Sequence, residues 1–236
     1  MSRWWVRRGA SGLACVAVVC VALYVVMNAR TFQLAGQLVS RVATEDKVVA
    51  LTFDDGPSPH VAELLDLLAE VDVRATFYLN GRDLQRFPHF GAAIAAAGHE
   101  IGNHSFSHRR MVLVSPATVA AEIEGTDAQI RATGYTGPIT FRPPYGKKLW
   151  TLPRYLAEHG RTTVMWDVEP DSADEQDATT ITRQAVDATR PGSIILLHVM
   201  FDGRDASRAA VSSIINGLRD RGYDFLTVSD LLRRGR

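Results

Sequence analysis

The stretch that decides the fold is Lys47-Val48-Val49-Ala50-Leu51-Thr52-Phe53-Asp54-Asp55-Gly56-Pro57. Residues 47–53 are mostly apolar and rich in β-branched side chains, which predicts a buried strand. Gly56-Pro57 predicts a turn that ends it. Asp54 and Asp55 therefore lie at the carboxyl end of the strand, where burying two carboxylates is costly unless they are paired or bind a metal. A solvated turn before a helix is the alternative interpretation.

Beyond this stretch, short apolar runs alternate with longer amphipathic segments. The runs predict strands at 47–53, 73–79, 99–103, 139–142, 162–167, 193–198 and 223–228. We expect helices near 59–70, 84–97, 116–133, 149–159, 176–189 and 206–221, with a short one after Ser229. Strands that alternate with helices are typical of parallel βαβ units. The predicted fold class is therefore α/β, an irregular (β/α)7 barrel over residues 47–236.

Length and composition limit the alternatives. The chain has 236 residues, of which 46% are apolar and 22% charged, and its formal net charge is zero. This length suits one sizeable core with an appendage rather than two independent domains. The basic residues are dispersed, so we expect no nucleic-acid partner. The oligomeric state is not determined by these features.

The appendage is at the N-terminus, where three arginines precede the apolar stretch Gly9–Met27. At about 1.5 Å per residue, a helix of this length crosses a hydrocarbon core of about 30 Å. The arginines favour a cytoplasmic N-terminus and an extracytoplasmic domain, in the periplasm or at the cell surface. A cleaved signal peptide, which would make the protein secreted, is the alternative. The predicted organisation is a basic tip 1–8, a transmembrane signal-anchor 9–27, a tether 28–46 and the domain 47–236.

Both cysteines, Cys15 and Cys20, fall inside the expected anchor. The domain therefore has no disulfide and no thiolate that could bind a metal.

Two histidines follow the third predicted strand, in His104-Ser105-Phe106-Ser107-His108. In a strand, residues four apart are separated by about 13 Å, too far to share one ion. On a helical turn or a coiled loop they are neighbours. If these histidines bind a metal, residues 104–108 cannot be extended. The alternative is that the spacing of the two histidines arose by chance, in which case it says nothing about the local backbone.

Ionisable residues follow five of the predicted strands. Parallel barrels build their sites at the carboxyl ends of strands, so these residues should converge on one mouth. They are Asp54 and Asp55, His104 and His108, Arg142 to Tyr145, Asp167 to Asp171, and His198.

With these motifs in place, the chain resembles the polysaccharide deacetylases of carbohydrate esterase family 4, the group with the NodB homology domain. The resemblance runs from about Lys47 to Leu232. It implies a metal-dependent hydrolase that removes acetyl groups from an N-acetylated polysaccharide of the cell envelope or matrix. It also implies a divalent metal, with zinc expected and cobalt or another first-row ion as alternatives.

The resemblance assigns the metal ligands and the base. Thr52-Phe53-Asp54-Asp55-Gly56-Pro57 resembles the first family motif, in which Asp54 would be the general base and Asp55 a metal ligand. His104 and His108, in the second motif, would be the other two ligands.

The remaining motifs would supply proton transfer and charge stabilisation. In Arg142-Pro143-Pro144-Tyr145-Gly146, Arg142 would orient the base and the Tyr145 backbone N–H would bind the oxyanion. In Leu196-Leu197-His198, His198 would be the general acid. A histidine suits that role because its charge changes near neutral pH.

One family motif is altered in this chain. The segment 166–174, Trp-Asp-Val-Glu-Pro-Asp-Ser-Ala-Asp, lacks the family's final tryptophan. Asp171 is our first candidate for the residue that tunes His198, and Asp174 is the second; either could instead be a solvated loop acid. The alteration keeps one alternative open, a catalytically silent glycan-binding module. A second alternative, an esterase or amidase of O-acetylated or small substrates, would use the same site.

Overall fold

The computed structural model describes residues 3–173 and 176–235, with the backbone alone for residues 3–14. The helices are α1 (Arg3–Asn28), α2 (Val61–Glu70), α3 (Gly81–Arg86), α4 (Pro88–Ala96), α5 (Pro116–Ala132), α6 (Thr151–Glu158), α7 (Ala178–Ala188), α8 (Asp205–Asp220) and α9 (Val228–Arg234). The strands are β1 (Leu38–Val39), β2 (Val48–Asp54), β3 (Thr76–Leu79), β4 (Glu100–Asn103), β5 (Thr163–Val164), β6 (Ile194–Leu197) and β7 (Asp224–Leu226).

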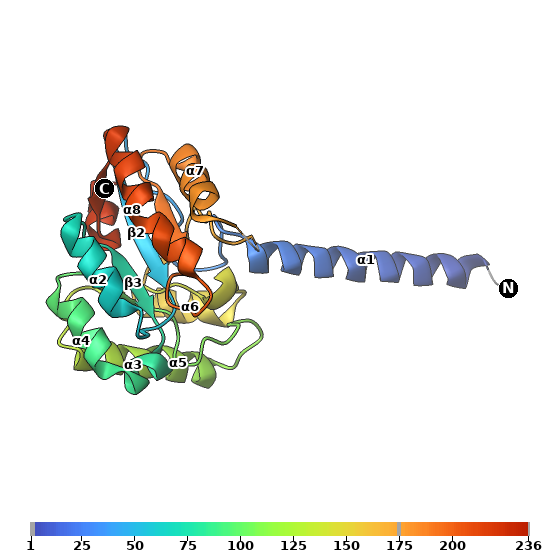
Figure 1. The fold of residues 1–236 in the computed structure, drawn as a ribbon. Helices are drawn as coiled ribbons and strands as arrows, with labels where there is room; N and C mark the ends of the chain where they lie inside the picture. The colour runs from blue at the N-terminus through green and yellow to red at the C-terminus, as the bar shows by residue number, and fades with distance from the viewer. Residues whose placement is uncertain (1–2, 174–175, 236) are drawn as a thin grey trace.

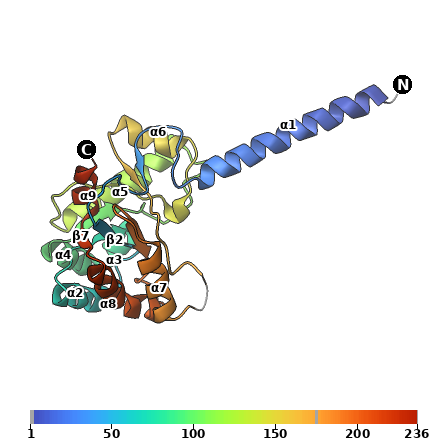
Figure 2. The ribbon, with the colours of Figure 1, turned by 90° about the horizontal axis from the view of Figure 1, so that it is seen from above.

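The strands pair in parallel, and helices surround them (Figures 1 and 2). Strand β2 pairs with β3, β6 and β7, and β3 pairs with β4. Bridges at Phe141 join β4 to β5, and a bridge between Val168 and Ile195 joins the segment after β5 to β6. The predicted α/β fold is therefore confirmed, although the expected strand 139–142 is reduced to the bridges at Phe141.

Strand β2 shows how the barrel places polar groups. Its side chains alternate between two faces, as in any strand. Val49, Leu51 and Phe53 face a core shared with residues of α2 and α8. On the opposite face, Val48 and Ala50 belong to a second apolar cluster. The same alternation places Thr52 and Asp54 on that second face, at the carboxyl end of the strand.

Part of the expected tether 28–46 belongs to the barrel. Strand β1 pairs in parallel with β5, with Leu38 opposite Thr163. Val42 is buried, and its backbone N–H donates to the Gly192 carbonyl at 2.9 Å. Residues 38–42 are thus a structural part of the domain, which the sequence did not predict because the run is short and flanked by polar residues.

Helix α1 projects away from the domain in both views (Figures 1 and 2). Apolar side chains between Val16 and Val25 are exposed, whereas those of residues 1–14, including the predicted basic tip and the start of the anchor, lie outside the described residues. Within the described part of the chain, no helix is long and apolar enough to span a membrane. This finding overturns our expectation of a protein anchored in a membrane through residues 9–27.

Candidate metal centre and active site

Three side chains from two strand ends meet at the mouth of the barrel. Asp55, His104 and His108 each offer a ligand atom, and these atoms lie within 4.8 Å of one another. Residues 104–108 form a coiled loop, not a strand. Ser105 and His108 have φ values of 63° and 56°, which turn the loop so that both imidazoles face Asp55.

The three side chains fit a divalent metal. The buried Oδ1 atom of Asp55 accepts no hydrogen bond from any described residue, although His108 Nε2 lies only 3.2 Å away. His104 Nδ1 lies 2.8 Å from the Arg142 carbonyl, which leaves Nε2 for the ion. Burial and the neighbouring His104 lower the pKa of His108 to about 3, so its ring is neutral, as a ligand must be. A carboxylate and two imidazoles are a donor set typical of zinc.

Burial raises the pKa of Asp55, and the neighbouring charge of Asp54 acts in the same direction. Such a carboxylate is poorly stabilised by the protein alone. A cation beside it would favour its ionised form.

Asp54 is held by a buried arginine. Arg142 is fully buried and donates to Asp54 Oδ1 at 2.6 Å and to Thr52 Oγ1 at 2.8 Å. Its other nitrogens donate to the carbonyls of Val164 and Met165. The remaining Asp54 oxygen, Oδ2, lies 3.7 Å from His104 Nε2. The arginine therefore orients this carboxylate toward the candidate metal ligands.

Two aromatic rings lie against the Arg142 guanidinium. Its central carbon lies 4.1 Å from the Tyr78 ring centroid and 5.5 Å from that of Trp166. Contact with aromatic faces helps to hold a planar cation in one orientation. Trp166, from the altered motif, thus contacts the arginine that binds Asp54.

His198 and Asp171 form a second pair at the mouth. Asp171 is buried; its Oδ2 accepts from the His198 backbone N–H at 2.7 Å, and its Oδ1 lies 3.2 Å from His198 Nδ1. Burial alone would lower the pKa of His198, but the hydrogen bond and charge of Asp171 raise it to about 9. The imidazole is therefore protonated at neutral pH, and its Nε2 is free to donate.

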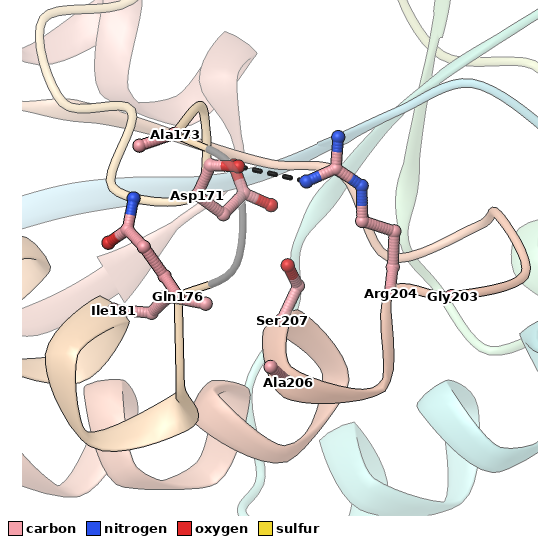
Figure 3. Close-up of a pocket in the computed structure, with 8 residues that line it drawn as sticks. All are labelled: Asp171, Ala173, Gln176, Ile181, Gly203, Arg204, Ala206 and Ser207. Atoms are coloured by element: carbon pink, nitrogen blue, oxygen red, sulfur yellow. Dashed lines mark hydrogen bonds between the residues drawn. The ribbon is translucent and has the colours of Figure 1, made fainter.

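A cavity of about 220 Å³ lies beside Asp171 and is lined by the start of α8 (Figure 3). Arg204 donates to the Asp171 carbonyl at 2.9 Å, and the Ser207 hydroxyl points toward the Asp171 carboxylate (Figure 3). These two residues hold the loop that carries Asp171. The second candidate, Asp174, lies outside the described residues.

Tyr145 occupies the rim. Its backbone adopts a left-handed conformation, with φ at 58°, in a 3-10 turn at Pro144–Gly146. Its ring is half exposed and lies 4.6 Å from the His108 ring centroid. Tyr145 thus lies beside the candidate metal ligand His108.

Not every expected residue joins the site. Asp167 accepts instead from Ser193 Oγ and the Ile194 N–H, both at 2.9 Å. Conversely, sequence reasoning missed Glu122, whose carboxylate accepts two hydrogen bonds from Ser107 in the ligand loop. A signal existed: Glu122 lies in the apolar stripe of α5, between Val119 and Thr126 at helical spacing.

Comparisons with known proteins point to one family. Residues 41–164 match the family described as "Polysaccharide deacetylase". A peptidoglycan-N-acetylglucosamine deacetylase of Bacillus cereus is 33% identical over 202 residues, which cover 84% of this chain and 94% of that protein. A crystal structure of a peptidoglycan N-acetylglucosamine deacetylase superposes with a TM-score of 0.79 at 31% identity, covering 83% of this chain and 92% of that one.

A second similar structure is a pseudoenzyme. It is a member of carbohydrate esterase family 4 from Bacillus anthracis, with a TM-score of 0.78 and 25% identity, covering 86% of this chain and 71% of that one. The fold alone therefore does not show that a chain is an active enzyme, and activity has to be argued from the residues of the site.

Proposed function

Because the chain belongs to the polysaccharide deacetylase family, we propose that it removes acetyl groups from the N-acetylglucosamine residues of peptidoglycan. Deacetylation of an N-acetylated cell-envelope polysaccharide, by hydrolysis of a C–N amide bond, is the activity of the chain. What we propose beyond that activity is the sugar, N-acetylglucosamine, and the polymer, peptidoglycan. They are supported by the similarity to two peptidoglycan N-acetylglucosamine deacetylases over most of both chains.

The observation that carries the proposal is the meeting of three groups at one mouth. The candidate metal ligands lie beside Asp54, which Arg142 holds at 2.6 Å, and the same mouth holds His198, which Asp171 keeps protonated. Glycan binding alone requires neither an oriented carboxylate nor a protonated histidine. This favours catalysis over a silent binding module.

Asp55, His104 and His108 would hold the metal, and zinc is the ion that suits them best. When bound, the ion would supply Lewis acidity that lowers the pKa of a water molecule and polarises the acetyl carbonyl.

The protein's own residues move the protons. Asp54 accepts a proton from the attacking water, whose oxygen forms a bond to the acetyl carbon. The Tyr145 backbone N–H donates to the carbonyl oxygen as charge develops there. His198 gives its proton to the amide nitrogen as the C–N bond breaks, which releases acetate and a free amine on the sugar.

The test is acetate release from peptidoglycan and from N-acetylglucosamine oligomers. We expect activity with added Zn²⁺, its loss after chelation, and a decrease of about 10²–10⁴-fold in kcat for Asp54→Asn, because that variant lacks the base. Asp187→Asn is a matched control on α7, since Asp187 pairs with Arg221 on the surface.

Unchanged acetate release after chelation or in Asp54→Asn would contradict the mechanism. Faster release from an O-acetylated glycan than from the N-acetylated one would contradict the substrate proposal and favour an esterase.

A further inference from the structure

Glu122 is a buried carboxylate on α5, remote in sequence from the family motifs. Its Oε2 accepts from the Ser107 backbone N–H at 2.8 Å, and its Oε1 accepts from the Ser107 hydroxyl at 2.6 Å. Ser107 immediately precedes the metal-ligand candidate His108. Both oxygens of one carboxylate are thus used to hold one loop residue.

Burying the Glu122 carboxylate costs folding free energy. Among the described residues, no basic side chain forms an ion pair with Glu122. Burying a carboxylate without a cation is unfavourable, and here two hydrogen bonds alone offset that cost. A neutral residue in the apolar stripe of α5 would avoid it.

The ligand loop needs support from outside. Ser105 and His108 occupy the left-handed region, which is unfavourable for residues with a Cβ. Inside the loop, the His108 N–H donates to Ser105 Oγ at 3.1 Å. At the start of the loop, Asn103 Nδ2 donates to the Ile123 carbonyl of α5 at 2.9 Å. Helix α5 therefore fixes both ends of the loop, through Asn103 and through Glu122.

The two histidines depend on this support to different degrees. The His104 ring is almost completely buried and is oriented by the Arg142 carbonyl at 2.8 Å. The His108 side chain is 17% exposed and packs against the half-exposed Tyr145. The position of His108 therefore depends mainly on its backbone, which Ser107 and Glu122 hold.

We propose that Glu122 is a positioning residue that, through Ser107, sets the place of His108 and thereby the metal affinity of the site. The inference rests on the metal site of the proposed function. Groups that orient metal ligands commonly change metal affinity by about 10–100-fold when they are altered.

The test is titration of the metal-free full-length chain with Zn²⁺ alone, by calorimetry, with the Co²⁺ absorption spectrum as a second readout. We expect Glu122→Gln to weaken Zn²⁺ binding by at least about tenfold and to alter the Co²⁺ bands. The amide keeps the shape of the carboxylate but has one acceptor oxygen and no charge, so the Ser107 hydroxyl has to turn to accept from the amide NH2 and both charge-assisted hydrogen bonds are lost. At saturating Zn²⁺, most of the kcat should return.

Glu124→Gln is the matched control. Glu124 lies on the same helix, and its carboxylate accepts from the Tyr155 hydroxyl at 2.8 Å on the exposed side. This variant should bind Zn²⁺ as the unmodified chain does.

A second variant, Ser107→Ala, keeps Glu122 but removes the hydroxyl donor. We expect it to weaken Zn²⁺ binding in the same direction, so it decides the question if Glu122→Gln does not fold. Zn²⁺ affinity unchanged in the folded variants would overturn the positioning role. Failure of the unmodified chain to bind Zn²⁺ would instead overturn the proposed function.

Discussion

At the residue scale, two adjacent aspartates have different surroundings. Consecutive side chains of a strand point to opposite faces, so two neighbours cannot normally share a site. Asp54 is the last residue of β2, but Asp55 has a φ of 73°, which turns its carboxylate back toward the mouth. Both carboxylates consequently lie within 4 Å of His104 Nε2, at 3.7 and 3.9 Å. Only Asp54 contacts Arg142, which agrees with the proposed roles of Asp54 as the base and Asp55 as a metal ligand.

The first prediction concerns Asp171→Asn. Asp171 raises the pKa of His198 to about 9, so the acid form should persist through neutral pH and be lost as the pH rises past that value. Without the carboxylate, burial dominates, and the alkaline limb of kcat/KM should move toward or below 6.5. A bound metal would affect the pKa of His198 equally in the unmodified chain and in the variant, so the difference between them reports on Asp171. An alkaline limb that stays in place would contradict this role.

The second prediction concerns Arg142→Met. The side chains of Arg142 and Asp54 are almost fully buried, so removing the cation leaves a buried carboxylate uncompensated. We expect a loss of about 3–5 kcal/mol in the free energy of unfolding, measured with urea. Arg154→Met is the control, because Arg154 pairs with Glu158 in solvent, where a pair contributes less than about 1 kcal/mol. Equal losses of unfolding free energy in the two variants would show that the buried ion pair stabilises the fold no more than the exposed one.

At the element scale, the short strand β1 joins two parts of the barrel. It pairs with β5, and the residues after it contact the start of β6: Arg41 bridges Ser193, and Val42 bonds to Gly192. Gly192 has a φ of +78°, and a Cβ there would lie 1.9 Å from the Val42 carbonyl oxygen. The contact between these backbones thus requires glycine at this position.

The third prediction compares Gly192→Ala with Gly134→Ala. Both glycines have positive φ, so both variants incur the left-handed cost of about 1–2 kcal/mol. A Cβ at Gly134 meets nothing within 4 Å, whereas at Gly192 it displaces the Val42 carbonyl. Gly192→Ala should therefore lose clearly more unfolding free energy in urea. Equal losses would mean that the segment after β1 can move without cost.

At the scale of the whole molecule, the chain before the first predicted strand has two parts. The described side chains of α1 are mostly exposed, and the helix projects from the domain (Figure 2). From Met27 onward the chain contacts the loops of the site: Lys148 N–H donates to the Met27 carbonyl at 3.3 Å, and Arg30 pairs with Glu169 at 2.6 Å. We therefore propose that the folding unit begins near Met27 and not at residue 47.

The fourth prediction follows from this boundary. A chain that begins at Met27 should melt at the same temperature as the full chain and keep its acetate release. A chain that begins at Lys47 lacks β1 and the buried Val42, a side chain whose burial alone contributes about 1.5–3 kcal/mol. It should melt at a lower temperature or fail to fold. Equal melting temperatures for the two truncated chains would place the boundary at residue 47.

Much of the architecture could be predicted because it depends on near neighbours. The apolar run 47–53 identifies β2, and polar residues after it mark the mouth, since the carboxyl ends of parallel strands meet on one side. The predicted membrane-anchored location is wrong. It was drawn from the apolar stretch 9–27 and the arginines that precede it.

The sequence by itself determined where most of the strands lie along the chain, the mouth and the residue types gathered there, because periodicity and turn residues act over a few positions. Only the tertiary structure decided which acid meets His198, that Glu122 holds Ser107, and that β1 completes the barrel. Asp171 and His198 are 27 residues apart, and Leu38 lies opposite the distant Thr163. Such pairs form only when the folded backbone brings remote segments together, so no local pattern encodes them.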